Sequence, residues 1–225
     1  MFEAVVLMGG LGTRLSSVSN GTPKSMMPVG GVPFVYILLK KLEAAGCKKV
    51  IFSLYYKADE IKEQILADNP VNCEIVFVVE DAPLGTGGAI KLASNSVCDE
   101  SFIALNGDTY SSLDYAKFFI ETNNNEFAIA GCKMPSAERY GSLHLDDDMN
   151  LTGITEKGIQ GPAIINSGTY LISKLSLAQI EEDVFSFEEV FIPKYLQKAK
   201  VSVFEGDFFD IGVPKDYYLA CEYFQ

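Results

Sequence analysis

Apolar residues recur along the first 134 positions in two alternating patterns. Short, almost uninterrupted apolar runs predict buried strands, whereas apolar residues three or four positions apart predict helices packed on one face. The first long helix carries Lys40 and Lys41 on another face, and Gly46 is a natural cap at its carboxyl end. The expected strands are Glu3–Met8, Val50–Leu54, Glu74–Glu80, Phe102–Leu105 and Phe127–Cys132, and the expected helices are Phe34–Ala45, Asp59–Leu66, Thr86–Ala93 and Leu113–Glu121.

The pattern changes after about Met134, where shorter alternating segments replace the regular succession of strands and helices. No internal repeat or linker divides the chain. The strands expected here are Ser142–Leu145, Leu151–Thr155, Ile164–Ile172 and Val201–Glu205, and the helices are Leu177–Glu182, Phe187–Leu196 with a kink or restart at Pro193, and a last one from Pro214.

Strands that alternate with helices predict βαβ units and a parallel sheet covered on both faces. We therefore expect one α/β domain over residues 1–225, with a Rossmann-like, mixed, mostly parallel sheet flanked by helices. The later β-rich segments are expected to form a small insertion that serves as a lid or pocket wall. Ligands bind such sheets at the carboxyl ends of the strands, so motifs that follow a strand are candidates for a site.

Composition narrows the classes of function. No apolar run approaches the roughly 20 residues of a membrane helix, and the N-terminal run lacks the basic flank of a signal peptide. Five dispersed cysteines without a CxxC pair indicate a reducing compartment, so we expect a cytoplasmic protein. The net charge of -12 disfavours nucleic acid and membrane surfaces as partners. His144 is the only histidine, which argues against a zinc hydrolase.

The first candidate site is the glycine-rich segment Gly9-Gly10-Leu11-Gly12-Thr13-Arg14-Leu15, directly after the first strand. Glycines let backbone N–H groups approach a polyphosphate, and the guanidinium of Arg14 suits bidentate phosphate contact. The segment is not a P-loop, because no GxxxxGK[ST] occurs. It is not a dinucleotide fingerprint either, because Leu15 stands where the third glycine would be. For the glycines alone, a flexible turn is the alternative.

The second candidate is Lys24, within Thr22-Pro23-Lys24-Ser25-Met26-Met27-Pro28-Val29. A lysine between two prolines is positioned at low conformational cost, which suits a cation placed against one phosphate. An isolated loop lysine is usually solvated, but the nearby Arg14 favours a functional interpretation.

In this order, GGLGTRL and PKSMMPV resemble the signature of the sugar-1-phosphate nucleotidyltransferases, which carry GGxGTRL and PK-x-M-x-P-V. The resemblance runs from Val5 to about Tyr217. Ser25 stands where many members have a second proline, and Gly158 stands where many have proline after Glu156-Lys157. The other segments that resemble the family are Leu84–Ile90, Asn106–Asp108, Arg139–Gly141, Glu156-Lys157, Asn166–Tyr170 and Asp210–Pro214.

The resemblance implies Mg²⁺-dependent transfer of a nucleotidyl group from an NTP to a sugar 1-phosphate, with release of pyrophosphate. Residues 1–134 would form the nucleotide-binding part and residues 135–225 the sugar-binding part with the C-terminal helix. The implied catalytic residues are Arg14, Lys24 and Asp108, and the implied metal ligands are Asp108 and Asp210. Nucleotide contacts are implied for Leu7, Gly9, Gly10, Gly12, Thr13, Glu80, Gly85, Thr86 and Gly88, and sugar-phosphate contacts for Gly141, Glu156, Lys157 and Asn166.

These residue types also suit the reaction in physical terms. An in-line displacement at the α-phosphorus needs no covalent intermediate, so catalysis is positioning plus charge stabilisation. Arg14 would neutralise the departing pyrophosphate, and Lys24 would stabilise charge on the α-phosphate. The two carboxylates would fix one or two Mg²⁺ ions. A cap or a turn is the ordinary alternative for each aspartate. We interpret the Asp146–Asp148 run as a solvated turn, and the aromatic residues between Phe185 and Tyr195 as core.

The sequence indicates the reaction class more clearly than it indicates the nucleotide base or the sugar. Pro83–Ile90, Phe185–Glu189 and Phe209–Tyr217 look most like the guanylyltransferases acting on D-glycero-D-manno-heptose 1-phosphate, whose product plausibly feeds cell-surface polysaccharide assembly. Glu80 could accept hydrogen bonds from guanine N1–H and its amino group, but also from uracil N3–H. Uridylyl or cytidylyl transfer to another phosphorylated sugar or small metabolite therefore stays open, as does a non-catalytic nucleotide-sensing subunit.

An oxidoreductase that uses a dinucleotide could share this fold. The missing third glycine and the absence of an acidic residue in Leu54–Lys57 count against it. A homodimer is the default expectation for such an enzyme.

Overall fold

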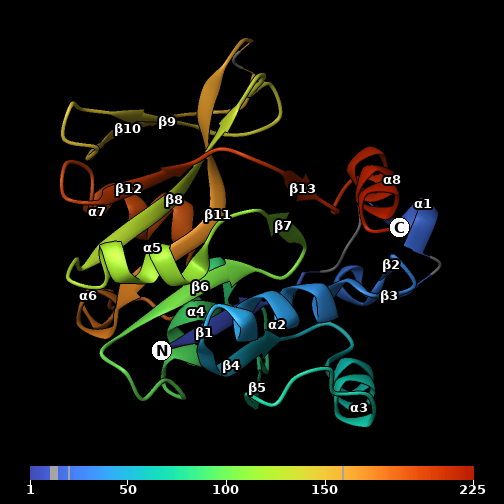
Figure 1. Cartoon of the computed structure of the whole chain (residues 1–225). Helices are drawn as coiled ribbons and strands as arrows, with labels where there is room; N and C mark the ends of the chain where they lie inside the picture. The colour runs from blue at the N-terminus through green and yellow to red at the C-terminus, as the bar shows by residue number, and fades with distance from the viewer. Residues whose placement is uncertain (11–14, 20, 159) are drawn as a thin grey trace.

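The computed structural model describes residues 1–10, 15–19, 21–158 and 160–225. Within these residues, one sheet runs in the order β10-β9-β11-β6-β1-β4-β5, with β8 beside β11 and β12 beside β8 (Figure 1). The strands of this sheet are β1 (Phe2–Leu7), β4 (Cys47–Leu54), β5 (Glu74–Val79), β6 (Ser101–Asn106), β8 (Phe127–Met134), β9 (Ser142–Leu145), β10 (Leu151–Thr155), β11 (Ala163–Ser173) and β12 (Lys200–Phe204).

The half of the sheet formed by β6, β1, β4 and β5 is parallel throughout, and β11 joins it antiparallel to β6. Parallel neighbours need crossover connections, and helices provide them. The prediction of a mixed α/β fold with a mostly parallel central sheet flanked by helices is confirmed. The helices are α1 (Ser16–Ser19), α2 (Phe34–Ala44), α3 (Ala58–Ala67), α4 (Gly85–Ser94), α5 (Tyr115–Thr122), α6 (Lys174–Ala178), α7 (Ile192–Lys194) and α8 (Pro214–Tyr223).

Both faces of the sheet are buried around β1, as an uninterrupted apolar strand requires. Successive side chains of β1 point to opposite faces. Ala4 and Val6 belong to the core that includes Val35 of α2, whereas Val5 belongs to the core that includes Ile90 of α4. The run of apolar residues in β1 therefore supplies two cores at once and fixes the strand in the middle of the sheet.

β11 carries an irregularity that shapes one wall of the site. Its pairing with β8 shifts register between Asn166 and Tyr170. Gly168 lies inside this bulge at φ +71°, and a Cβ there would lie 2.4 Å from the side-chain nitrogen of Asn106. Both the positive φ and the close approach require glycine at this position.

The short strands are the elements that the sequence pattern misses. β7 (Thr109–Ser111) pairs antiparallel with β13 (Phe208–Asp210), and β2 (Pro28–Val29) forms a hairpin with β3 (Val32–Pro33). Runs of two or three residues show no detectable periodicity. In Figure 1, α8 lies beside the β2–β3 hairpin, next to the C-terminus.

The prediction of a helix at Leu177–Glu182 is wrong in its bounds. α6 spans Lys174–Ala178, because the side chain of Ser173 accepts a hydrogen bond from the N–H of Ser176 and begins the helix earlier.

The expected restart near Pro193 is observed. A π-helical turn, η3 (Phe187–Phe191), is followed by α7, whose first turn contains Pro193. The aromatic residues here stack as core, and the rings of Phe187 and Phe191 are 4.6 Å apart. All four residues of this predicted core cluster are buried: Phe185, Phe187, Phe191 and Tyr195.

The Asp146–Asp148 run forms the expected turn between β9 and β10. Oδ1 of Asp146 accepts hydrogen bonds from the N–H groups of Asp148 and Asn150, at 3.0 and 2.8 Å. The hydrogen bond from the Asn150 side chain, followed by these backbone bonds, lowers the pKa of Asp146. The acidic run is therefore a solvated turn former.

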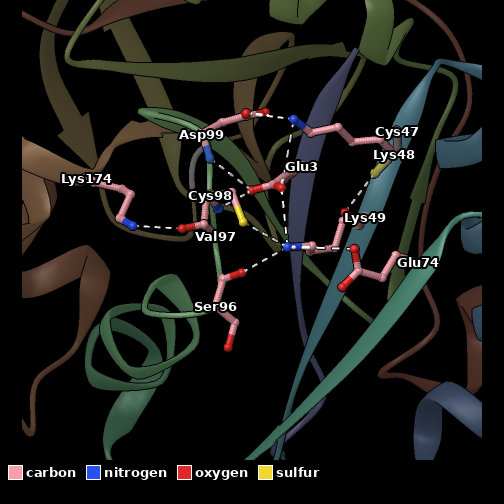
Figure 2. A network of polar contacts seen from close by, with 10 residues as sticks. All are labelled: Glu3, Cys47, Lys48, Lys49, Glu74, Ser96, Val97, Cys98, Asp99 and Lys174. Atoms are coloured by element: carbon pink, nitrogen blue, oxygen red, sulfur yellow. Dashed lines mark hydrogen bonds and ion pairs between the residues drawn. The ribbon is translucent and has the colours of Figure 1, made fainter.

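A buried carboxylate ties the amino ends of β1 and β4 to the segment before β6 (Figure 2). Glu3, whose side chain is 2% exposed, accepts hydrogen bonds from the N–H groups of Cys98 and Asp99, at 2.6 and 3.1 Å. The ammonium of Lys49 lies 3.5 Å from the other carboxylate oxygen. The charge of Glu3 is thus compensated on both sides.

Replacing Glu3 by glutamine should lower the free energy of unfolding by about 3–5 kcal/mol, because it leaves the nearly buried ammonium of Lys49 without its buried counter-charge. Urea denaturation followed by circular dichroism measures this change. Glu74→Gln is the matched control, since this exposed carboxylate lies 3.8 Å from the same ammonium and should contribute about 0–1 kcal/mol. Equal effects of the two substitutions would contradict a special role for the buried group.

No helix in the described ranges combines the length and apolar character needed to cross a membrane.

Candidate active site

Two adjoining cavities lie at the carboxyl ends of the parallel strands. The first, of about 470 Å³, is lined by the residues that follow β1, β4 and β5, by the start of α4 and by Lys24. The second, of about 850 Å³, is lined by the segment just before β9 and by β10, β11, η3 and α7. Four residues line both cavities: Asn106, Thr109, Glu188 and Asp210.

The expected nucleotide residues that the structure describes lie around the first cavity, with one exception. Gly12, Thr13 and Arg14 lie outside the described residues. The predicted residues that line this cavity are Leu7, Gly9, Gly10, Glu80, Gly85 and Thr86.

Glu80 presents a fixed carboxylate to the first cavity. One oxygen accepts a hydrogen bond from the hydroxyl of Ser53 at 3.3 Å, and the other accepts from the N–H of Leu84 at 3.0 Å. Gly9 passes directly beside it, since a Cβ on Gly9 would lie 3.1 Å from Glu80 Oε1. A buried carboxylate held in this way can accept further hydrogen bonds from the edge of a base.

Gly88, the exception, packs against the late part of the chain and does not line the cavity. The N–H groups of Gly87 and Gly88 donate to the carbonyl of Phe185, at 2.9 and 3.4 Å. A Cβ on Gly88 would lie 2.2 Å from the carbonyl oxygen of Asp183. These glycines allow two backbones to approach each other.

Lys24, Asp108 and Asp210 converge at the junction of the cavities. Lys24 begins a 3₁₀ turn, η2 (Lys24–Met26), and its ammonium lies 3.2 Å from Asp108 Oδ2. The pairing of β13 with β7 sets Asp210 opposite Thr109, next to Asp108. A Cβ built on Gly212 would lie 2.7, 3.0 and 3.4 Å from Asp210 Oδ1, Lys24 Nζ and Asp108 Oδ2, so all three groups surround one point.

This arrangement fits a hard divalent cation. Two carboxylates supply anionic oxygen ligands, and no group of three or more His, Cys, Asp or Glu that could hold a metal occurs in the described part of the chain. A cation held by only two carboxylates keeps positions for water and substrate phosphate, as Mg²⁺ does in phosphoryl-transfer sites.

The four expected sugar-phosphate residues line the second cavity: Gly141, Glu156, Lys157 and Asn166. The amide of Asn166 is oriented within the β11 bulge. It donates to the hydroxyl of Tyr170 at 2.9 Å and accepts from the N–H of Gly168 at 3.0 Å. Lys157 supplies a cation to this cavity, where a sugar phosphate would need one.

Asp216 is a functional candidate that the sequence analysis missed. It is buried in the first turn of α8, where a negative charge is favoured, and it pairs with the guanidinium of Arg139. The hydroxyl of Tyr140 also donates to it at 3.0 Å. Burial, and then the charge of Asp216, raise the pKa of Tyr140, so this hydroxyl keeps its proton. Asp216 thereby fixes two residues of the second cavity; its one signal is its place just after the Asp210–Pro214 motif.

Glu188 is the second missed candidate. It lines both cavities, and its carboxylate accepts a hydrogen bond from the hydroxyl of Thr86 at 2.8 Å. In the sequence this residue looks like an ordinary helix charge, and only its place in the Phe185–Glu189 segment separates it from Glu181 or Glu182.

A cavity with a fixed carboxylate adjoins a second, larger cavity, and a lysine and two aspartates converge where they meet. This is the site of an enzyme that joins two phosphate-bearing substrates. The family model described as nucleotidyl transferase matches residues 3–224, and the chain belongs to this family. Enzymes of this family generally use a divalent metal.

Individual relatives match over nearly the full length. The chain is 37% identical to D-glycero-alpha-D-manno-heptose 1-phosphate guanylyltransferase from Campylobacter jejuni subsp. jejuni serotype O:2, over 96% of this chain and 97% of that protein. It is 35% identical to the enzyme of the same name from Aneurinibacillus thermoaerophilus, over 97% and 96% of the two proteins.

Among solved structures, HddC from Yersinia pseudotuberculosis is 48% identical and superposes with a TM-score of 0.94 over 100% of both chains. A second structure of HddC, complexed with GMP-PN, gives a TM-score of 0.93.

Proposed function

We propose that the protein transfers a guanylyl group from GTP to D-glycero-α-D-manno-heptose 1-phosphate in the presence of Mg²⁺, releasing pyrophosphate. The observation that carries the proposal is the convergence of Lys24, Asp108 and Asp210 at the junction of two substrate-sized cavities. The base and the sugar are supported by the similarity to HddC, crystallised with GMP-PN, and by the two heptose guanylyltransferases.

The residues divide the work of an in-line displacement. The attacking oxygen belongs to a sugar phosphate and is already anionic, so no general base is needed. Lys24, which lines the first cavity, is assigned to the charge on the α-phosphate, and Lys157, which lines the second, is assigned to orienting the sugar phosphate for attack. Arg14 is assigned to the pyrophosphate and Glu80 to the base. When bound by Asp108 and Asp210, Mg²⁺ supplies positive charge that offsets the phosphates.

The two parts of the chain take different substrates in this proposal. The nucleotide is assigned to residues 1–134 and the sugar phosphate to residues 135–225. Supporting this division, the second cavity is lined mainly by residues beyond Arg139. Four residues line both cavities, and in this proposal they surround the place where the substrates react. They are Asn106 and Thr109 from the first part of the chain, and Glu188 and Asp210 from the second. The reaction would take place in the cytoplasm.

The test is to incubate the protein with Mg²⁺, each of the four NTPs, and heptose or hexose 1-phosphates, following pyrophosphate release and product mass. We expect pyrophosphate with GTP and a product with the mass of GDP-heptose. Mannose 1-phosphate, which lacks one carbon, should react with a kcat/KM about 10- to 100-fold lower. Reaction with UTP or CTP alone would reassign the base, and turnover of none of the NTPs, despite metal-dependent NTP binding, would favour a sensing subunit.

A further inference from the structure

Glu188 occupies the boundary between the two cavities. It is the second residue of η3 and lines both the first and the second cavity, whereas its neighbour Glu189 lines only the second cavity. Its Oε2 accepts hydrogen bonds from the hydroxyls of Thr86 at 2.8 Å and Ser186 at 3.4 Å. Within the described residues, no cation pairs with Glu188 and no donor contacts its Oε1. A carboxylate oxygen is thus left to accept a hydrogen bond from outside the protein.

The orientation of this carboxylate is set by the chain around it. The Thr86 hydroxyl accepts a hydrogen bond from the N–H of Phe187 at 2.9 Å, so its own proton is directed to Glu188. The backbone on either side is held by the bonds from Gly87 and Gly88 to the carbonyl of Phe185. Such a pre-oriented acceptor loses little entropy when a ligand donates to it.

The surroundings favour a hydroxyl as the donor. An unpaired carboxylate repels phosphate, and Lys157 lines the same cavity as the cation that attracts it. Burial, and then the negative charge of Glu188, raise the pKa of Tyr170, whose hydroxyl keeps its proton beside Asn166. The neighbouring wall is apolar, from Ile192 and Pro193. An acceptor next to an apolar wall suits the polyol part of a sugar.

We propose that Glu188 is a specificity-determining residue whose carboxylate accepts a hydrogen bond from a hydroxyl of the acceptor sugar, and that Thr86 positions this carboxylate. The inference rests on the proposed function, because it needs a sugar 1-phosphate in the second cavity. The ribose of the nucleotide carries the same chemistry and could reach the same junction, so the experiment compares the two sources.

The experiment compares kcat/KM for the natural sugar 1-phosphate and for analogues that each lack one hydroxyl, in wild type and Glu188→Ala. We expect one analogue to react about 10- to 100-fold more slowly than the natural sugar with wild type, because it cannot make the hydrogen bond to this charged acceptor. With Glu188→Ala, this ratio should fall to within about twofold. The ratio does not depend on the fraction of folded enzyme, since both substrates meet the same preparation.

Thr86 is tested by rescue. Thr86→Val removes the hydroxyl and should reduce the same ratio, whereas Thr86→Ser keeps the hydroxyl and should retain it. Glu182→Ala is the matched control, because it removes an exposed carboxylate of the same segment that lines neither cavity. It should retain the wild-type ratio.

Three results would overturn the inference. Equal ratios for every analogue in wild type and Glu188→Ala would remove Glu188 from sugar recognition. If Glu188→Ala changed only the ratio of kcat/KM between GTP and 2′-deoxy- or 3′-deoxy-GTP, the carboxylate would be assigned to the ribose. Wild-type inactivity with every NTP and sugar 1-phosphate would overturn the proposed function as well, so the two failures are distinguishable.

Discussion

Asp108→Asn and Asp210→Asn are each expected to lower kcat by about 10³-fold. The two carboxylates and the Lys24 ammonium surround one point near Gly212. Asparagine keeps the size of aspartate but removes its charge, so the remaining carboxylate alone binds the divalent cation more weakly. Initial rates at saturating GTP and sugar 1-phosphate measure the loss. The Mg²⁺ concentration for half-maximal rate should rise in both variants.

Asp147→Asn provides the control for charge, because it removes one carboxylate from the exposed turn between β9 and β10. This variant should keep kcat within about twofold of wild type. If Asp108→Asn or Asp210→Asn retained more than about a tenth of the wild-type kcat with an unchanged Mg²⁺ dependence, that residue would not be a metal ligand.

Lys24→Met should lower kcat by about 10²- to 10³-fold while GTP binding weakens much less. The Lys24 side chain is 14% exposed, and its ammonium lies 3.2 Å from the carboxylate of Asp108. Pro23 and the η2 turn restrict the position of Lys24. The ammonium is therefore already in place when negative charge develops on the α-phosphate in the transition state. Single-turnover rates together with GTP titration separate the chemical step from binding.

Lys215→Met is matched to this change, since it removes an exposed cation five positions after Asp210 without touching either cavity. It should leave kcat nearly unchanged. A Lys24→Met enzyme that lost affinity for GTP in proportion to its activity would show that Lys24 binds the ground state, and the assignment to the transition state would be wrong. Lys24→Arg tests geometry, because a guanidinium carries the charge but not the compact shape of the ammonium.

The parallel half of the fold could be predicted because its strands are long and apolar. In β1, each residue from Phe2 to Val6 is buried, so the apolar run that the sequence shows is the physical property that places the strand. β7 and β13 are three residues each and are held by long-range pairing, which leaves no trace in local periodicity. That pairing nevertheless brings Asp210 to Asp108, and only the motif resemblance indicated it.

The residues of the site also fall into those that the sequence predicts and those that only the tertiary structure reveals. Asp108 follows β6 and Glu80 follows β5, so their position at the carboxyl edge of the sheet is predictable from the sequence. Glu188 and Asp216 lie on helical segments and look like surface charges until the tertiary structure shows what they contact. For Gly88, the sequence suggested a ligand contact, whereas the structure shows a packing role. Close approach to phosphate and close packing of two backbones both require glycine, so the sequence alone does not distinguish them.

The contacts of the α4 loop with Phe185 and Glu188 have a consequence for the order in which the protein acquires its activity during synthesis. The hydroxyl of Thr86 and the carboxylate of Glu188 are 102 positions apart, and the carbonyl that holds Gly87 and Gly88 emerges equally late. On the ribosome, the four parallel strands and their helices are complete long before this loop can be locked. In a nascent chain, the α4 loop would therefore lack these contacts until residue 188 has emerged, so this side of the nucleotide cavity would be completed late in synthesis.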